Sequence, residues 1–468
     1  MISKWAKEEL SQINLGDKRL NNRFLELVSA ASKQPQNSLN RLFHTRKEVQ
    51  ACYRFFSNDL VNEEKILAPH QLKTVERASH DPVVLCLSDT TCLNYTTRKK
   101  LKDSGYISSN NAQGFFLHAT IAITPERLHL GIVGQKIWAR EKQKESRSSA
   151  ERGNLLLSEK ESYRWLEAYN ESCALSERCE YTEVIHVTDR EGDIFEIFKS
   201  YEQKKLEGKP AEYIVRSNHN RTVYLKDKTE RLYTHLAESK VLAEISFDIV
   251  KREENTTRRV RQTVHAMPIQ IKSRYGADNP KEDVSLNAVY LKEIDCPEGE
   301  SPVTWCLLTS LPITNLEQIK KTAEYYLCRW EIEVFFKTFK SGCKVEEKSL
   351  RSAERLYPLF SLLLLVAWRI NFLLHVSRIA PEICCTAFFE RSEWKSGYVA
   401  ATRDRSSIPS VPPTIQSMMG YIAKLGGYQG RKNDPIPGLK AIWIGICKLA
   451  NYADAWDLFG PESSSNQA

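Results

Sequence analysis

The chain has 468 residues, a length that corresponds to about three domains of ordinary size. Hydrophobic residues make up 41% and charged residues 27%, proportions that exclude a largely disordered protein. The net charge of +8 suits a polyanionic partner without requiring one, and the 12 cysteines lack the paired C-x-x-C spacing of a zinc ribbon.

The amino-terminal segment lacks the apolar core of a secretory signal peptide. The most apolar run of the chain, 356–374, is interrupted by Pro358, Arg369 and Asn371. We therefore expect a buried helix there instead of a membrane span, no membrane partner, and a cytoplasmic, nucleoid-associated protein.

Residues 1–75 are predicted to be helical. Arg19 and Arg23 are i, i+4 neighbours near a helix start, where positive charge opposes the helix dipole. Contact with phosphate groups would compensate for this placement, and a plain solvated face explains it equally well.

Short apolar strands begin near residue 82, and two of them end in an acid, Asp89 and Asp189. Strands are expected at 82–89, 115–124, 128–138, 183–189 and 211–217, and helices at 160–169 and 194–201, with a charged loop at 140–149. This order of elements, three strands followed by a helix, a strand, a helix and a strand, is the order of the RNase H-like fold, a mixed α/β sheet flanked by helices.

Residues 220–310 interrupt this order with alternating segments typical of an antiparallel β insertion, which carries a basic ribbon of Arg258, Arg259 and Arg261. A last strand, 302–310, contains Trp305. The segment 401–413 is expected to be a linker, and helices are expected at 414–425 and 439–458.

The stretch 326–340 contains no helix breaker, and we expect one continuous helix. On it Tyr326, Arg329, Glu333 and Lys340 would fall within about 60° of one another, a single polar stripe. Such a stripe is either a solvated charged face or a site where a carboxylate, two cations and a phenol meet a metal ion and a phosphate backbone.

Adjacent strand ends and a helix crossing them would bring Asp89, Asp189 and Glu333 together. Three carboxylates at one place repel one another unless a cation binds, and oxygen ligands suit Mg²⁺ or Mn²⁺. Each aspartate taken alone is better explained as a turn or helix cap, and the coincidence of two such strands with the polar stripe favours the joint site. Glu191 and Asp193 are rivals for the role of Asp189. His118 and His186 are expected to be core histidines.

These motifs resemble the DDE transposases of bacterial insertion sequences, in particular the cut-and-paste group with the Y-R-E-K signature. Tyr326, Arg329, Glu333 and Lys340 match the spacing of that signature, and Asp89-Thr-Thr and Asp189-Arg-Glu-Gly-Asp193 match the other two acidic motifs. Trp305 resembles the tryptophan on which a flipped end base stacks, and Arg216 resembles a DNA-contacting arginine. The segments 15–19 and 53–55 resemble the amino-terminal DNA-binding region, and the helix after 425–427 resembles the dimerising tail.

The resemblance implies Asp89, Asp189 and Glu333 as catalytic metal ligands for two Mg²⁺ ions, which Mn²⁺ could replace. It implies DNA contacts by Tyr326, Arg329, Lys340, Trp305 and Arg216, in addition to those considered above for Arg19 and Arg23. A homodimer would pair two inverted terminal repeats, cleave them through a hairpin, and join the 3′-hydroxyl ends to target DNA.

The corresponding domains are a helical DNA-binding domain at 1–75, a catalytic core at 76–375 with its β insertion, and a dimerisation and DNA-contact region at 376–468. Three alternatives remain. They are a metal-dependent endonuclease without strand transfer, a catalytically silent DNA-binding derivative, and an enzyme for another phosphate ester.

Overall fold

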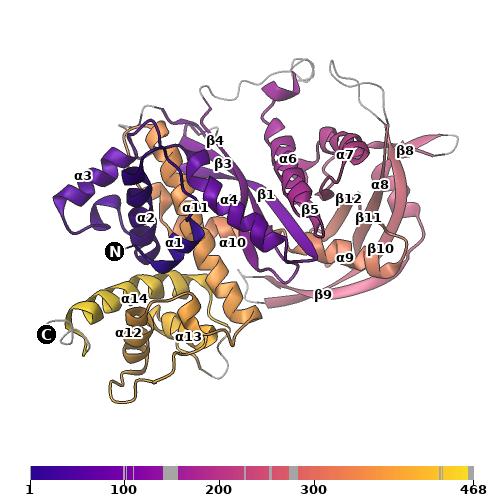
Figure 1. The fold of residues 1–468 in the computed structure, drawn as a ribbon. Helices are drawn as coiled ribbons and strands as arrows, with labels where there is room; N and C mark the ends of the chain where they lie inside the picture. The colour runs from indigo at the N-terminus through magenta and orange to yellow at the C-terminus, as the bar shows by residue number, and fades with distance from the viewer. Residues whose placement is uncertain are drawn as a thin grey trace.

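The computed structural model describes residues 2–98, 101, 103–108, 110–140, 156–225, 228–251, 256–272, 283–431, 434 and 436–461. Nearly all of the charged loop expected at 140–149 lies outside these ranges. Figure 1 shows the described helices and strands, with the N-terminal and C-terminal helices at the left of the view and strands β8–β11 of the sheet at the right.

The centre of the molecule is a mixed sheet. Its first strands are β1 (Val83–Asn94), β2 (Gly105–Tyr106), β3 (Gln113–Ile123), β4 (His129–Trp138), β5 (Glu183–Thr188) and β6 (Glu212–Arg216). The strand order is β4-β3-β1-β5-β6, with β1, β3 and β4 antiparallel and β5 and β6 parallel to β1; β2 pairs with the edge of β3. This arrangement confirms the predicted RNase H-like core.

The predicted end of the first strand at Asp89 was wrong, because β1 continues to Asn94. Parallel pairing with β5 stops at Leu87, but antiparallel pairing with β3 runs on from Asp89 to Asn94. The polar pair Thr90-Thr91 looked like a turn signal, yet β-branched threonine also fits a half-buried strand. Asp89 therefore lies within β1, two residues after Leu87, which is the last residue of β1 that pairs with the parallel strand β5.

The predicted insertion contains β7 (Thr222–Tyr224), β8 (Thr229–Arg231), β9 (Ala243–Lys251), β10 (Thr256–Ile271) and β11 (Val284–Ile294), followed by β12 (Thr304–Thr309). Strand β12 pairs antiparallel with β6, so these strands extend the central sheet instead of forming a separate one. A short helix, α8 (Leu232–Glu238), lies among them and was not predicted.

The basic ribbon on β10 is matched by acidic partners. The ion pairs are Arg258 with Glu293 and Glu300, Arg259 with Asp248, and Arg261 with Glu244 and Asp295. Its positive charge is therefore largely balanced within the insertion.

Helices cover both faces of the core sheet: α4 (Glu63–Ala78), α6 (Tyr163–Arg178), α7 (Phe195–Glu207), α9 (Leu316–Leu327), α10 (Trp330–Lys337) and α11 (Ala353–Ile379). Because side chains alternate along a strand, Leu85 and Leu87 of β1 belong to the apolar cluster that contains α10 and α11. Val84 and Cys86 belong to the other cluster, which contains residues of α6 and α7.

The apolar run predicted as a buried helix is α11, which reaches Ile379. Of the described helices, it alone has the length and apolar composition to cross a membrane, and 89% of its most apolar window is buried within the protein. Its burial in the core confirms the expected core helix.

The chain ends are helical, as predicted, with α1 (Lys4–Glu9), α2 (Lys18–Lys33) and α3 (Arg46–Phe55) at the start and α13 (Ile415–Leu425) and α14 (Leu439–Phe459) at the end. Helix α12 (Arg391–Thr402) was not predicted. Short 3₁₀ turns lie at Leu39–Arg41, Leu157–Glu159, Arg190–Gly192, Val345–Glu347 and Cys385–Ala387.

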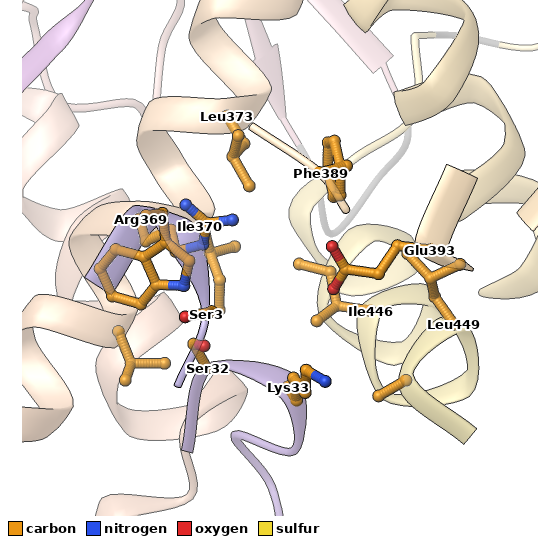
Figure 2. Close-up of a pocket in the computed structure, with 13 residues that line it drawn as sticks. Ser3, Ser32, Lys33, Arg369, Ile370, Leu373, Phe389, Glu393, Ile446 and Leu449 are labelled. Atoms are coloured by element: carbon orange, nitrogen blue, oxygen red, sulfur yellow. The ribbon is translucent and has the colours of Figure 1, made fainter. Parts of the chain in front are cut away.

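The two ends of the chain meet over α11. A cavity of about 30 Å³ lies at this junction and is lined by residues of α2, α11, α12 and α14, among others. Figure 2 shows the lining side chains. On one wall Arg369 lies 4.3 Å over the Trp5 ring and donates to the Phe388 carbonyl, and its burial lowers the guanidinium pKa to about 10. The backbone N–H of Lys4 also donates to Glu390, the N-cap residue of α12. These contacts fix the first helices against the last.

Candidate active site

The sequence predicted one continuous helix over 326–340, and this prediction was wrong. Helix α9 is capped by Asn315, whose side chain accepts from the Gln318 N–H, and it ends at Leu327. The N–H groups of Cys328 and Arg329 each bond the carbonyl three residues back, which tightens the chain before α10 begins at Trp330. A π-helical turn, Thr338–Gly342, follows α10 and contains Lys340. The break changes the direction of the polar stripe between Tyr326 and Glu333.

Arg329, at this break, bridges two of the three candidate acids. Its Nη2 lies 2.6 Å from Oε1 of Glu333, and its Nη1 lies 3.7 Å from Oδ2 of Asp89. The Arg329 and Asp89 side chains are only 14% and 18% exposed, so water screens this contact weakly. Asp89 and Glu333, which are far apart in the sequence, thus meet at a single guanidinium, because β1 packs against α10.

The Asp89 carboxyl is held in an unfavourable environment for its charge. Burial is the main cause that raises its pKa to about 7, and the charges of Asp189 and Glu333 raise it further. The Thr90 N–H, which donates to Asp89 at 2.7 Å, and the Arg329 charge act in the opposite direction. The charges of Asp189 and Glu333 are therefore both near enough to act on Asp89.

Asp189 follows β5 directly and caps the 3₁₀ turn Arg190–Gly192, with its side chain accepting from the Glu191 N–H at 2.8 Å. Of its two rivals, Asp193 is buried and engaged by Arg221 and by the N–H groups of Asn218 and His219. Glu191 is 65% exposed and pairs with Arg164 at 2.8 Å. Those contacts give both rivals a structural explanation.

Tyr326, Trp305 and Arg216 lie beside one another near this acidic site. The Tyr326 and Trp305 rings are 5.9 Å apart, and Trp305 also stacks on Phe247 at 6.0 Å. Burial raises the pKa of Tyr326, while the charges of Arg216 and Arg329 lower it. Among the residues that the structure describes, the Tyr326 hydroxyl has no hydrogen-bond partner. A buried, unpaired phenol next to two guanidinium groups suits an additional polar ligand.

Lys340, Arg19 and Arg23 each form a hydrogen bond or an ion pair within the protein. The Lys340 Nζ donates to the Cys92 carbonyl at 2.7 Å and lies 3.7 Å from Glu346. Arg19 pairs with Asp17, the N-cap residue of α2, and is 92% exposed; Arg23 pairs with Glu26. The structure thus places Lys340 at the end of β1, near the acids, and both arginines in the first turns of α2.

Arg164 of α6 is a supporting residue that the sequence reasoning missed. Its Nε donates to the Thr90 hydroxyl at 3.0 Å, and this hydroxyl also contacts Nδ1 of His118 at 2.9 Å. His118 is buried, as expected, and so is His186, whose Nδ1 contacts Ser172. The network holds the residue after Asp89 in place. No local motif marks Arg164, since only the fold brings α6 to β1.

The donor set tests whether a cation fits among the three acids. Asp89, Asp189 and Glu333 offer only carboxylate oxygens, the ligands that hard divalent ions prefer. The positive Arg329 guanidinium, which contacts Asp89 and Glu333, offsets part of the repulsion between these two acids. The residues present therefore fit a divalent metal.

Three protein-family models match the chain in sequence order. Residues 2–61 match the transposase DNA-binding model, residues 198–369 the transposase DDE domain, and residues 365–458 the transposase Tn5 dimerisation domain. The first range contains Arg19 and Arg23, and the second contains Glu333; Asp89 and Asp189 precede the matched part of the DDE domain. A DDE domain implies a divalent metal requirement, and the other two domains imply DNA binding and dimer formation. With its RNase H-like core and these three matches, the chain belongs to the DDE transposases of the Tn5 type.

Proposed function

We propose that this transposase cleaves transposon ends and joins their 3′-hydroxyls to target DNA, with Asp89, Asp189 and Glu333 as its catalytic carboxylates. The observation that carries the proposal is that the Arg329 guanidinium joins two of these acids, Asp89 and Glu333, while the third acts on Asp89 by its charge. Separate structural caps would not need three carboxylates at one place.

Two Mg²⁺ ions, replaceable by Mn²⁺, are the proposed cofactor, held by the same three carboxylates. When bound, such a pair lowers the pKa of a water or 3′-hydroxyl and stabilises the leaving oxyanion of an in-line phosphoryl transfer. A neighbouring cation would also stabilise the buried charge of Asp89, which its surroundings disfavour. Arg329 keeps Asp89 and Glu333 close together until that charge arrives.

The groups around the acids are suited to hold a DNA backbone. Tyr326 offers an unpaired hydroxyl, and Arg329 offers a planar guanidinium that recognises phosphate oxygens in pairs. Lys340 and Arg216 supply further positive charge at the same edge. These contacts position a strand without reading its sequence.

Trp305 is the proposed stacking surface for an end base during hairpin formation. Its ring is partly buried between Phe247 and Tyr326, which hold it rigid. Extruding a base costs a few kcal/mol of stacking energy, and an aromatic platform returns about 1–3 kcal/mol of it. The rigid neighbours reduce the entropy lost when the base docks.

The remaining parts of the chain supply specificity and assembly. We propose that residues 1–75 bind the inverted terminal repeats, with Arg19 and Arg23 contacting phosphates, that 76–375 catalyse, and that 376–468 pair two protomers. Helices α4 and α11 run a few residues across these limits. The protein would act in the bacterial cytoplasm, on the nucleoid.

Product analysis tests this proposal. The full-length protein is incubated with Mg²⁺ and a labelled duplex bearing the terminal repeat that flanks its gene, together with a plasmid target. We expect nicked ends, hairpin ends that migrate as longer strands on a denaturing gel, and ends joined to the plasmid. Nicked products alone would identify an endonuclease without strand transfer, and binding without cleavage would identify a silent derivative.

A further inference from the structure

A second group of potential metal ligands lies behind the helix that carries Glu333. Glu331 of α10 faces His129 of β4 and His375 of α11, and the ligand atoms of the three residues all lie within 4.8 Å of one another. Residues two apart on a helix point about 200° from each other, so Glu331 and Glu333 lie on nearly opposite faces of α10. This cluster is therefore distinct from the acidic site.

The distances in the cluster suit coordination better than hydrogen bonding. Oε2 of Glu331 is 3.6 Å from Nε2 of His129 and 3.6 Å from Nε2 of His375, too long for hydrogen bonds. Ligands of a tetrahedral ion with bonds of about 2.0–2.1 Å are separated by about 3.3–3.4 Å. The two carboxylate–imidazole distances exceed that value by a few tenths of an ångström, and the ligand nitrogens of the two imidazoles lie within 4.8 Å of each other.

The surroundings leave the His129 imidazole without another partner among the described residues. His129 is 1% exposed, and neither of its ring nitrogens has a hydrogen-bond partner among the described residues. The His129 and His375 rings lie nearly parallel with centroids 4.9 Å apart. A buried histidine without a partner is costly, and an ion would satisfy it.

The supporting contacts fix the three ligands from outside. Oε1 of Glu331 accepts from Arg127 at 3.3 Å, which leaves Oε2 turned toward the two imidazoles. The Trp368 indole donates to the His129 carbonyl at 2.9 Å, which ties β4 to α11. Partners of this kind orient ligands in protein metal sites. Arg127 is 49% exposed, so water screens its repulsion of a cation.

We propose that His129, Glu331 and His375 bind one transition-metal ion of the Zn²⁺ class. Two imidazoles and one carboxylate are a borderline-soft donor set, which suits Zn²⁺ better than the Mg²⁺ expected at the all-oxygen site. The ion joins β4, α10 and α11, and so holds the helix that presents Glu333 against the core. It is a structural ion and not a participant in strand cleavage.

Zinc titration of a chain that lacks the acidic site tests the proposal. The full-length Asp89→Asn/Asp189→Asn/Glu333→Gln protein is stripped with a chelator, dialysed and titrated with Zn²⁺ by calorimetry. We expect one ion per chain. Co²⁺ used as a spectroscopic substitute should give visible absorption bands that saturate at one ion per chain. Absence of stoichiometric Zn²⁺ binding by this folded chain would overturn the proposal.

Two further substitutions locate the ion. Glu331→Gln preserves the side-chain shape and His375→Asn shortens it, and each should weaken Zn²⁺ binding at least tenfold. His235→Asn, which changes a histidine outside the cluster, should leave the affinity unchanged. Circular dichroism shows whether each variant is folded. If His375→Asn unfolds, the Zn²⁺ affinity of the isosteric Glu331→Gln variant alone tests where the ion binds. If the chain binds Zn²⁺ with the same affinity with and without the Glu331→Gln substitution, the ion binds elsewhere and the proposal is wrong.

Discussion

Replacing Asp89 by asparagine should stabilise the metal-free protein while removing a proposed ligand. The folded-state pKa of Asp89 is about 7 in place of an ordinary 3.8, so its ionised form is penalised in the folded protein. The penalty is absent below the ordinary pKa, grows between the two values and is complete above pH 7. Linkage gives a gain for Asp89→Asn of about 4 kcal/mol at pH 8 and about 2 kcal/mol at pH 5.

Thermal unfolding in EDTA measures this effect at the two pH values. The midpoint of Asp89→Asn should exceed that of the unsubstituted chain by several degrees at pH 8, and by less at pH 5. Asp59→Asn, an exposed residue outside the site, is the control and should change neither midpoint. A lower midpoint for Asp89→Asn at pH 8 would refute the reasoning, because the carboxylate would then stabilise the folded protein instead of opposing it.

Three other changes probe the rest of the molecule. In Gly445→Ala the new Cβ would lie 1.9 Å from the Ile422 carbonyl oxygen, so α13 and α14 must separate at a cost of about 1–3 kcal/mol. A lower melting midpoint is therefore expected. The control is Gly420→Ala, whose new Cβ meets open space and should lower the midpoint little. Arg19→Gln should reduce the salt dependence of end binding by about one counterion in the logarithmic slope, and an unchanged slope would remove Arg19 from the interface. Trp305→Leu should leave the first nick intact and reduce hairpin yield on denaturing gels; equal loss of both steps would indicate a general packing role.

Local patterns were sufficient for the parts of this protein that are determined by neighbouring residues. Alternating and apolar runs predicted β3, β4, β5 and β6, and their order predicted the RNase H-like sheet. The interrupted apolar run predicted α11 as a buried helix. Each of these elements has a hydrophobic period or a composition that differs from its surroundings, so a short stretch of sequence is enough to predict it.

Features that depend on tertiary contacts could not be predicted in this way. The extension of β1 past Asp89 depends on pairing with β3, and the break at Cys328-Arg329 gives no signal in helix propensity. Arg329 was expected beside Glu333, but its contact with Asp89 requires β1 and α10 to be superposed. Glu331 was passed over because its partners, His129 and His375, are distant in the sequence.

The most direct test of the central claim compares three single substitutions, Asp89→Asn, Asp189→Asn and Glu333→Gln, in one cleavage assay. Each protein is assayed for binding to labelled terminal-repeat DNA by mobility shift and for nicking after addition of Mg²⁺. We predict that all three bind the ends with affinity close to that of the unsubstituted chain and that none nicks them. Undiminished nicking by any one of them would contradict its assignment as a catalytic carboxylate.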